Sequence, residues 1–151
     1  MGLMQISRKA DYALRAVIYL STQDPKKSCS VPEIASRQGV PQKFLEKIIR
    51  ELIRGGLVKS KRGWDGGYRL ARPPDQISFR DVMEAVEGPI AVNLCMDPRQ
   101  TCDHQARCSM VAVWSEVQRK VIDVFSSTTL ADLKPASCGA VASSSSLSSA
   151  A

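Results

Sequence analysis

A glycine-rich basic segment at residues 55–72 follows a basic amphipathic stretch and limits what this chain can fold into. Residues 57–61 and 67–71 have the composition of two short strands. Asp65-Gly66-Gly67 is expected to form the turn between them, because glycine tolerates positive φ and Asp-Gly favours tight hairpins. The segment carries five cations: Lys59, Lys61, Arg62, Arg69 and Arg72. A hairpin this short has little core of its own, so it predicts the wing of a winged helix, with cations that face a polyanion.

The charge is unevenly divided along the chain. Residues 1–72 hold 15 lysines and arginines against 6 aspartates and glutamates, a net +9, whereas residues 73–151 hold 6 against 9, a net −3. A basic half of this kind suits docking on phosphate, and the alternative is an ordinary solvated basic surface. The chain has no long apolar run and no signal-peptide layout. We therefore expect a cytoplasmic protein whose five cysteines do not form a disulfide framework.

Two helices are expected immediately before the hairpin. Ser30 and Glu33 have the spacing of a capping box and start a short helix that Gly39 ends. A second helix is expected from about Pro41 to Arg54, with this apolar face: Phe44, Leu45, Ile48, Ile49, Leu52 and Ile53. Two helices joined by a short turn that contains glycine predict a helix-turn-helix motif.

The helix that begins at Pro41 is the candidate recognition helix. Polar side chains gather at its N-terminal end, the end that reaches base edges in the major groove. The residues expected to contact DNA from this helix are Gln42, Lys43, Glu46, Lys47 and Arg50. Those expected to contact DNA from the wing are Lys61, Arg62, Trp64, Tyr68 and Arg69. The alternative is a helix face that is only solvated.

Helical periodicity continues on both sides of this region. It predicts a first helix over 7–21, a short helix over 78–87 and a long helix from about Ala106 to Phe125. The long helix has a heptad seam: Met110, Trp114, Val117, Val121 and Val124. Further apolar positions outside the seam favour a dimerisation helix that also packs on its own domain, and the alternative is a helix that only covers the core.

The expected fold is therefore mainly α with a small β-hairpin, a winged helix-turn-helix plus a long C-terminal dimerisation helix. We divide it into a DNA-binding region over 1–72, and a sensor loop with the dimerisation helix over 73–134. The serine- and alanine-rich residues 135–151 have the composition of a disordered tail.

Three cysteines, Cys95, Cys102 and Cys108, lie in the loop expected before the long helix. No Cys-x-x-Cys is present, which disfavours a zinc ribbon or a redox dithiol, and the spacing does not match common ferredoxin patterns. Thiolates are nevertheless the ligands that iron–sulfur clusters require, and a loop can wrap a cluster. Cys29 and Cys138 lie outside this loop and are not assigned to it.

These motifs, in this order, resemble the Rrf2 family of bacterial transcription regulators. The resemblance covers about residues 4–134. The stretches that carry it, besides the cysteine loop, are 4–15, 31–35, 44–47, Arg62-Gly63 and Gly66-Gly67-Tyr68. It implies a homodimer that binds a double-stranded DNA operator, acts as a repressor and is not an enzyme. It also implies that Arg62 or Trp64 at the wing tip approaches the minor groove.

The resemblance further implies a [2Fe-2S] or [4Fe-4S] cluster on Cys95, Cys102 and Cys108, which senses iron–sulfur status, nitric oxide or redox state. The first gap between these cysteines is one residue longer than the family's commonest spacing. Asp11 matches an aspartate that the partner subunit contributes in the family's nitric-oxide sensors, and His104 is the second candidate for a fourth ligand. The rival interpretations are a cluster-free thiol- or zinc-based DNA-binding regulator and an iron–sulfur electron carrier.

Overall fold

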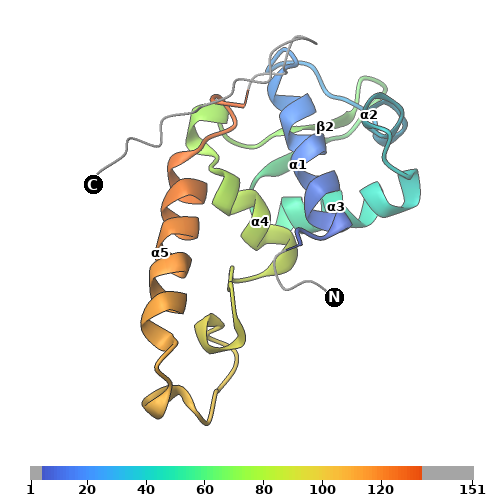
Figure 1. The fold of residues 1–151 in the computed structure, drawn as a ribbon. Helices are drawn as coiled ribbons and strands as arrows, with labels where there is room; N and C mark the ends of the chain where they lie inside the picture. The colour runs from blue at the N-terminus through green and yellow to red at the C-terminus, as the bar shows by residue number, and fades with distance from the viewer. Residues whose placement is uncertain (1–4, 134–151) are drawn as a thin grey trace.

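The computed structural model of the protein describes residues 5–133 and confirms the mainly α fold with a small hairpin (Figure 1). The helices are α1 (Arg8–Ser21), α2 (Val31–Gln38), α3 (Gln42–Arg54), α4 (Phe79–Glu87) and α5 (Val111–Ser127). The strands are β1 (Val58–Lys61) and β2 (Gly67–Leu70), and three 3-10 turns are η1 (Pro74–Gln76), η2 (Leu94–Met96) and η3 (Gln105–Arg107). None of the helices in this range is long and apolar enough to cross a membrane. The predicted tail over 135–151 and Cys138 lie outside the described residues.

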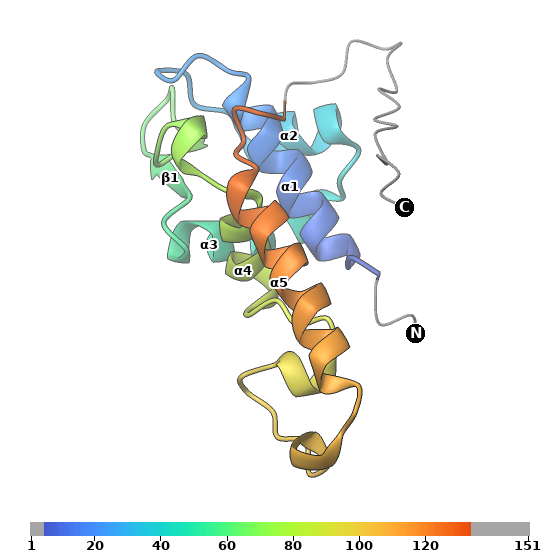
Figure 2. The same cartoon turned by 60° about the vertical axis from the view of Figure 1, so that its left-hand side comes forward.

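The core forms where α1 packs against α2, α3 and α4 (Figures 1 and 2). Helix α3 contributes four buried side chains to it: Leu45, Ile48, Ile49 and Leu52. Fully burying a side chain of this size stabilises the fold by about 1.5–3 kcal/mol. The predicted apolar face of α3 also included Phe44 and Ile53, but these side chains are 59% and 38% exposed and do not belong to the core.

Serine caps position the helices as their sequences predict. The Ser7 hydroxyl accepts from the Ala10 N–H at the start of α1, and the Ser30 hydroxyl accepts from the Glu33 N–H at the start of α2. A complete capping box forms at α4, where Ser78 and Asp81 each accept from the other's backbone N–H. Such caps satisfy N–H groups that a helix leaves without partners, and each is worth about 1 kcal/mol.

The Glu33 carboxylate ties α2 to the end of α1. It accepts a hydrogen bond from the Tyr19 hydroxyl at 2.9 Å and lies 3.3 Å from the Lys27 ammonium. The Tyr19 hydrogen bond holds the pKa of Glu33 below its usual range, and Lys27 adds to that effect. A depressed carboxyl pKa means that the folded protein gains stability above the unfolded pKa. That stability is lost as the pH falls through the folded pKa.

We expect Tyr19→Phe to lower the free energy of unfolding by about 1 kcal/mol at pH 7, because it removes one hydrogen bond to a carboxylate. The difference from wild type should begin to shrink as the pH falls below about 4 and be lost as it falls through the lowered pKa of Glu33 in the folded wild type, below which Glu33 is protonated in both proteins. Urea unfolding at several pH values measures this. A difference that stays constant down to pH 3 would show that the lost stability comes from packing of the ring and not from the carboxylate.

The hairpin has an antiparallel register in which Val58 pairs with Leu70 and Lys61 with Gly67. The two predicted strands are confirmed, and the connection between them is the five residues 62–66. The turn lies earlier than the predicted Asp65-Gly66-Gly67, because the Gly66 N–H donates to the Gly63 carbonyl at 3.0 Å and Gly67 already pairs in β2. Cys29 adds a bridge to the sheet. Its N–H donates to the Tyr68 carbonyl at 2.9 Å, and its carbonyl accepts from the Tyr68 N–H at 2.8 Å. This pairing fixes the base of the wing to the loop before α2.

Helix α5 begins at Val111, five residues later than the predicted start at Ala106, which lies in η3. It packs on α4 as expected, with the Phe79 and Phe125 rings 4.7 Å apart. The predicted seam divides between two environments. Trp114, Val117 and Val121 are half-buried, whereas the ends of the seam are open to solvent, with Met110 58% and Val124 60% exposed.

Candidate nucleic-acid interface and cysteine loop

The polar face of α3 lies opposite its buried face and is open to solvent. Gln42, Lys43, Lys47 and Arg50 are exposed, and the half-buried Glu46 carboxylate accepts from the Gln42 side-chain amide at 3.3 Å. The structure therefore places all five predicted residues of the recognition helix on one accessible surface. Phe44 joins them there. The apolar periodicity of the sequence predicted a core position for its ring.

The five predicted wing residues fall into two groups. Arg62 and Trp64 lie exposed in the wing tip (62–66), and the Trp64 side chain is 100% exposed. Lys61 is exposed beside the tip and pairs with Asp65, which lowers the pKa of the Asp65 carboxyl. Tyr68 and Arg69 lie at the base of the wing instead. There the half-buried Tyr68 ring packs against the core.

The alternation of side chains along β2 explains the place of Tyr68. Tyr68 and Leu70 are two residues apart on one strand, so they lie on the same face of the sheet, and both pack against the core. This alternation is present in the sequence, and it would have predicted that Tyr68 faces the core and not the DNA. Ser60, the partner of Tyr68, shares that face, and Lys59 and Arg69 lie on the other.

The three cysteines lie in the segment between α4 and α5, which extends beyond the body of the domain in both views (Figures 1 and 2). Cys95 is in η2, Cys108 follows η3, and Cys102 lies between them. All three are half-buried thiols without a disulfide. Gln118 of α5 holds the start of the segment, since its amide donates to the Ile90 carbonyl at 2.7 Å and its oxygen accepts from the Val92 N–H at 3.0 Å.

The predicted ligands fit an iron–sulfur cluster in kind, but this conformation does not assemble them. Among residues 5–133 no three histidine, cysteine, aspartate or glutamate side chains gather into a group that could hold a metal ion. His104 is exposed at the start of η3. Asp11 lies in the first turn of α1, where its carboxylate accepts from the Arg15 guanidinium at 2.9 Å. A cluster therefore requires the loop to rearrange so that the three thiols meet, and a fourth ligand from this chain or from a second chain.

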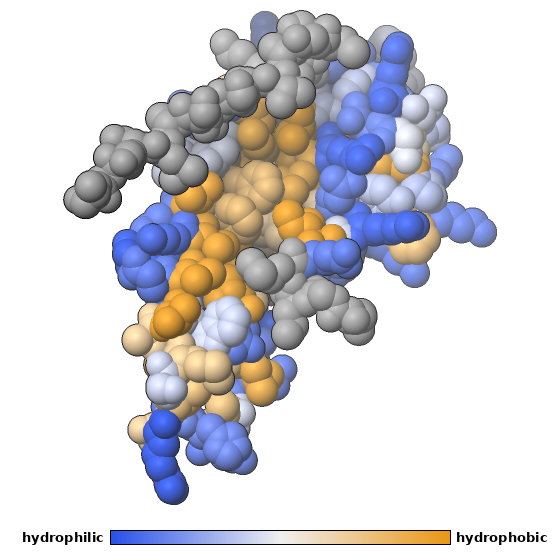
Figure 3. All heavy atoms as spheres, in the orientation of Figure 1, coloured by the Kyte–Doolittle hydropathy of each residue, from blue (hydrophilic) through white to orange (hydrophobic). Residues whose placement is uncertain are grey.

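Apolar side chains form a continuous surface along α5 and the neighbouring part of the domain (Figure 3). Met110 at the N-cap of α5, and Val113 and Val124 on the helix, are each more than half exposed. An adjoining groove of about 510 Å³ is lined by Ile6, α1, the start of α4 and Leu133, which follows α5. Its apolar residues are Ile6, Leu14, Ile18, Phe79 and Leu133, and Asp11 lies on its polar side with Arg8 and Arg15.

The family model described as "Rrf2: Iron-dependent Transcriptional regulator" matches residues 6–136, which is most of the chain. The chain belongs to the Rrf2 family. An rrf2-like HTH-type transcriptional regulator of Rhodobacter capsulatus is 34% identical over 136 residues, which cover 85% of this chain and 91% of that protein. Protein rrf2 of Nitratidesulfovibrio vulgaris is 32% identical over 130 residues, covering 86% of this chain and 87% of that protein.

Solved structures agree with this Rrf2 assignment and with the winged-helix fold. CymR (YrzC), the global cysteine regulator of B. subtilis, has a TM-score of 0.73 and 32% identity, covering 86% of this chain and 95% of CymR. IscR of T. potens has a TM-score of 0.70 and 33% identity, covering 85% of each chain. These relatives are DNA-binding transcriptional regulators, so the Rrf2 protein described here is a regulator and not an enzyme.

Proposed function

We propose that this Rrf2 protein is a cytoplasmic homodimeric repressor, which reads a double-stranded operator with α3 in the major groove and the wing tip against the neighbouring minor groove. The observation that carries the proposal is the exposure of two adjoining surfaces. Lys43 and Lys47 on α3 and Arg62 and Trp64 in the wing tip all face solvent. Polar residues at the start of a recognition helix read bases, whereas arginine and apolar wedges suit the minor groove.

Arg62→Ala should weaken operator binding about tenfold at low salt and reduce the slope of log affinity against log salt by about 1. The reason is that Arg62 is an exposed cation at the tip, so it releases counterions when it meets the DNA. The measurement is fluorescence anisotropy on a duplex that the wild-type protein selects from a random library.

Arg119→Ala is the control for this experiment, because Arg119 is an exposed cation on α5 that pairs with Glu116 and Asp123. It should leave both the affinity and the salt slope unchanged. If Arg62→Ala and Arg119→Ala have the same effect, the wing tip does not contact DNA.

The apolar surface of α5 supports the homodimer. Val113 and Val124 on α5 and Met110 at its N-cap are exposed beside other apolar side chains (Figure 3), and contiguous apolar surface of this kind marks interaction sites. In the proposed dimer, α5 of one subunit packs along α5 and the groove beside α1 of the other. Asp11 lines that groove, so the same arrangement brings Asp11 toward the partner's cysteine loop. This supports Asp11, before His104, as the fourth ligand supplied in trans.

For the signal, we propose that Cys95, Cys102 and Cys108 together hold an iron–sulfur cluster, [2Fe-2S] or [4Fe-4S], in the assembled dimer. When bound, such a group would supply reactivity toward nitric oxide, oxidants or iron loss. The chain's own contribution is mechanical. Gln118 joins the start of the cysteine segment to α5, so a change in that segment is transmitted to the dimer helix. A dimer with two states then binds the operator differently in each state.

Cys102→Ala should abolish cluster binding and change operator affinity about tenfold, while thermal unfolding of the apo protein stays within about 2 °C of wild type. The thiol is half-buried in a peripheral segment, so its loss removes little core. Anaerobic purification, iron and acid-labile sulfide analysis, absorbance and nitric oxide titration measure the first effect. Ser109→Ala, an exposed change in the same segment, should keep the cluster.

The second candidate is a cluster-free regulator that responds through thiols or zinc. The absence of a group of three metal-ligating side chains within residues 5–133 favours the thiol form of this candidate. A colourless, iron-free wild-type protein that stays colourless after cluster reconstitution, yet still binds DNA, would select this candidate. Zinc analysis of that protein would then separate a metal site from free thiols.

A further inference from the structure

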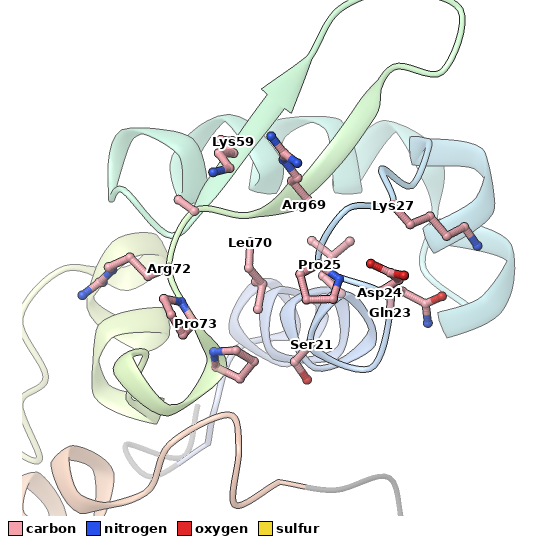
Figure 4. Close-up of a pocket in the computed structure, with 13 residues that line it drawn as sticks. Ser21, Gln23, Asp24, Pro25, Lys27, Lys59, Arg69, Leu70, Arg72 and Pro73 are labelled. Carbon is pink, nitrogen blue, oxygen red and sulfur yellow. The ribbon is translucent and has the colours of Figure 1, made fainter.

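A hollow of about 290 Å³ lies beneath the base of the wing, between β2, the end of α1 and the following loop (Figure 4). Its floor and walls are largely apolar: Leu20, Pro25, Leu70, Ala71, Pro73 and Pro74. Four cations also line it, Lys27, Lys59, Arg69 and Arg72, against one acid, Asp24. None of its lining residues belongs to α3 or to the wing tip. Apart from Arg69, which the sequence predicts to contact DNA, the hollow is therefore a separate surface from the proposed operator contacts.

Two of these cations are not neutralised. Lys27 pairs with Glu33, and Arg72 lies 3.8 Å from Asp81. By contrast, neither Lys59 nor Arg69 has an acidic partner within residues 5–133. The register places Lys59 directly opposite Arg69, and Figure 4 shows both side chains together above Leu70 and Pro25. Like charges directly opposite on a sheet destabilise it.

The Arg69 side chain also leaves a donor without an acceptor. Its Nε atom is buried and has no hydrogen-bond partner in the described part of the chain. A buried donor of a charged group is costly to leave unsatisfied. An anion in the hollow would accept from Arg69 and neutralise the repulsion with Lys59. The one acid of the hollow does not do this, because the Asp24 carboxylate accepts from the Lys26 backbone N–H in its own loop.

We propose that this hollow binds a small organic anion, with its phosphate or carboxylate head on Arg69 and Lys59 and its apolar body against Ala71 and the prolines Pro25, Pro73 and Pro74. The volume suits a molecule of roughly ten non-hydrogen atoms. The apolar lining distinguishes this site from a surface that contacts the DNA backbone. The anion would join β2 to the end of α1, since residues from both line the same hollow.

Phenyl phosphate and inorganic phosphate are the probes, followed by ¹H–¹⁵N correlation spectra of the full-length protein. Phenyl phosphate should bind about tenfold more tightly than inorganic phosphate, and the shifts should map to Ser21, Gln23, Leu70 and Ala71. Arg69→Met and, separately, Lys59→Met should each weaken binding about tenfold. Lys26→Met removes a cation from the same loop but not from the hollow, so it should leave binding unchanged.

Several results would overturn the proposal. Absence of saturable binding would do so, as would equal affinity for the two probes. Shifts confined to α3 and the wing tip, with Arg69→Met lowering operator affinity and salt slope as Arg62→Ala does, would identify Arg69 as a DNA-phosphate contact instead. The spectra of each variant without ligand establish that it is folded, so a lost affinity is assigned to the removed side chain.

Discussion

Val124→Glu should convert the protein to a monomer at micromolar concentration and weaken operator binding by at least about 100-fold. Val124 is 60% exposed on the apolar face of α5, about three helical turns after Val113, which is 63% exposed. In the proposed dimer this face is covered, so a carboxylate there would be buried without a partner, once in each subunit. A monomer binds only one half-site and loses the gain in affinity that comes from linking two recognition helices.

Ser126→Glu is the control, because Ser126 is exposed on α5 and points away from the Val113 and Val124 face. It adds the same charge and should leave the protein dimeric. Sedimentation velocity gives the oligomeric state, and anisotropy on the selected operator gives the affinity. A Val124→Glu protein that sediments as wild type would place the dimer interface elsewhere, whereas a monomer that keeps full operator affinity would separate DNA binding from dimerisation.

The parts of the fold that the sequence predicted are those with local signals. The helices follow from apolar periodicity, and their starts follow from caps such as Ser7, Ser30 and Ser78, because a cap acts within one turn. Helix α5 has no side-chain cap, and its apolar pattern extends into the preceding segment. Its start at Val111 follows the turns around Cys108, and apolar periodicity does not predict such turns.

Pairing between residues far apart along the chain could not be predicted from the sequence either. Cys29 is fully buried and bridges Tyr68 across about forty residues, yet no pattern around Cys29 suggests a strand. Burial raises the pKa of its thiol, which suits a structural role and not a reactive one. For the candidate sites, the exposure of the α3 residues proposed to contact DNA followed from helical geometry. The arrangement of the three cysteines did not follow from their spacing, because a loop has no fixed period.

Gly67→Ala should lower the free energy of unfolding by about 3 kcal/mol. Gly67 has a φ of +148°, and an added Cβ would lie 2.6 Å from the Cys29 carbonyl oxygen and 2.8 Å from its carbon. Both are backbone atoms, so the contact cannot be relieved by a side-chain rotation. To relieve it, β2 must move away from Cys29, and the two hydrogen bonds between Cys29 and Tyr68 are then lost.

Gly39→Ala isolates the effect of backbone conformation alone. Gly39 has a φ of +63° at the end of α2, but an added Cβ there meets no atom within 4 Å, so this change should cost about 1 kcal/mol. Urea unfolding compares the two variants, and hydrogen exchange at the Cys29 and Tyr68 amides follows the bridge directly. Faster exchange at both amides in Gly67→Ala, together with weaker operator binding below the unfolding transition, would show that this contact positions the wing for DNA. Equal costs for the two variants would mean that the loop around Cys29 yields without breaking the bridge, and that the wing is held by its core-facing Tyr68 and Leu70 side chains.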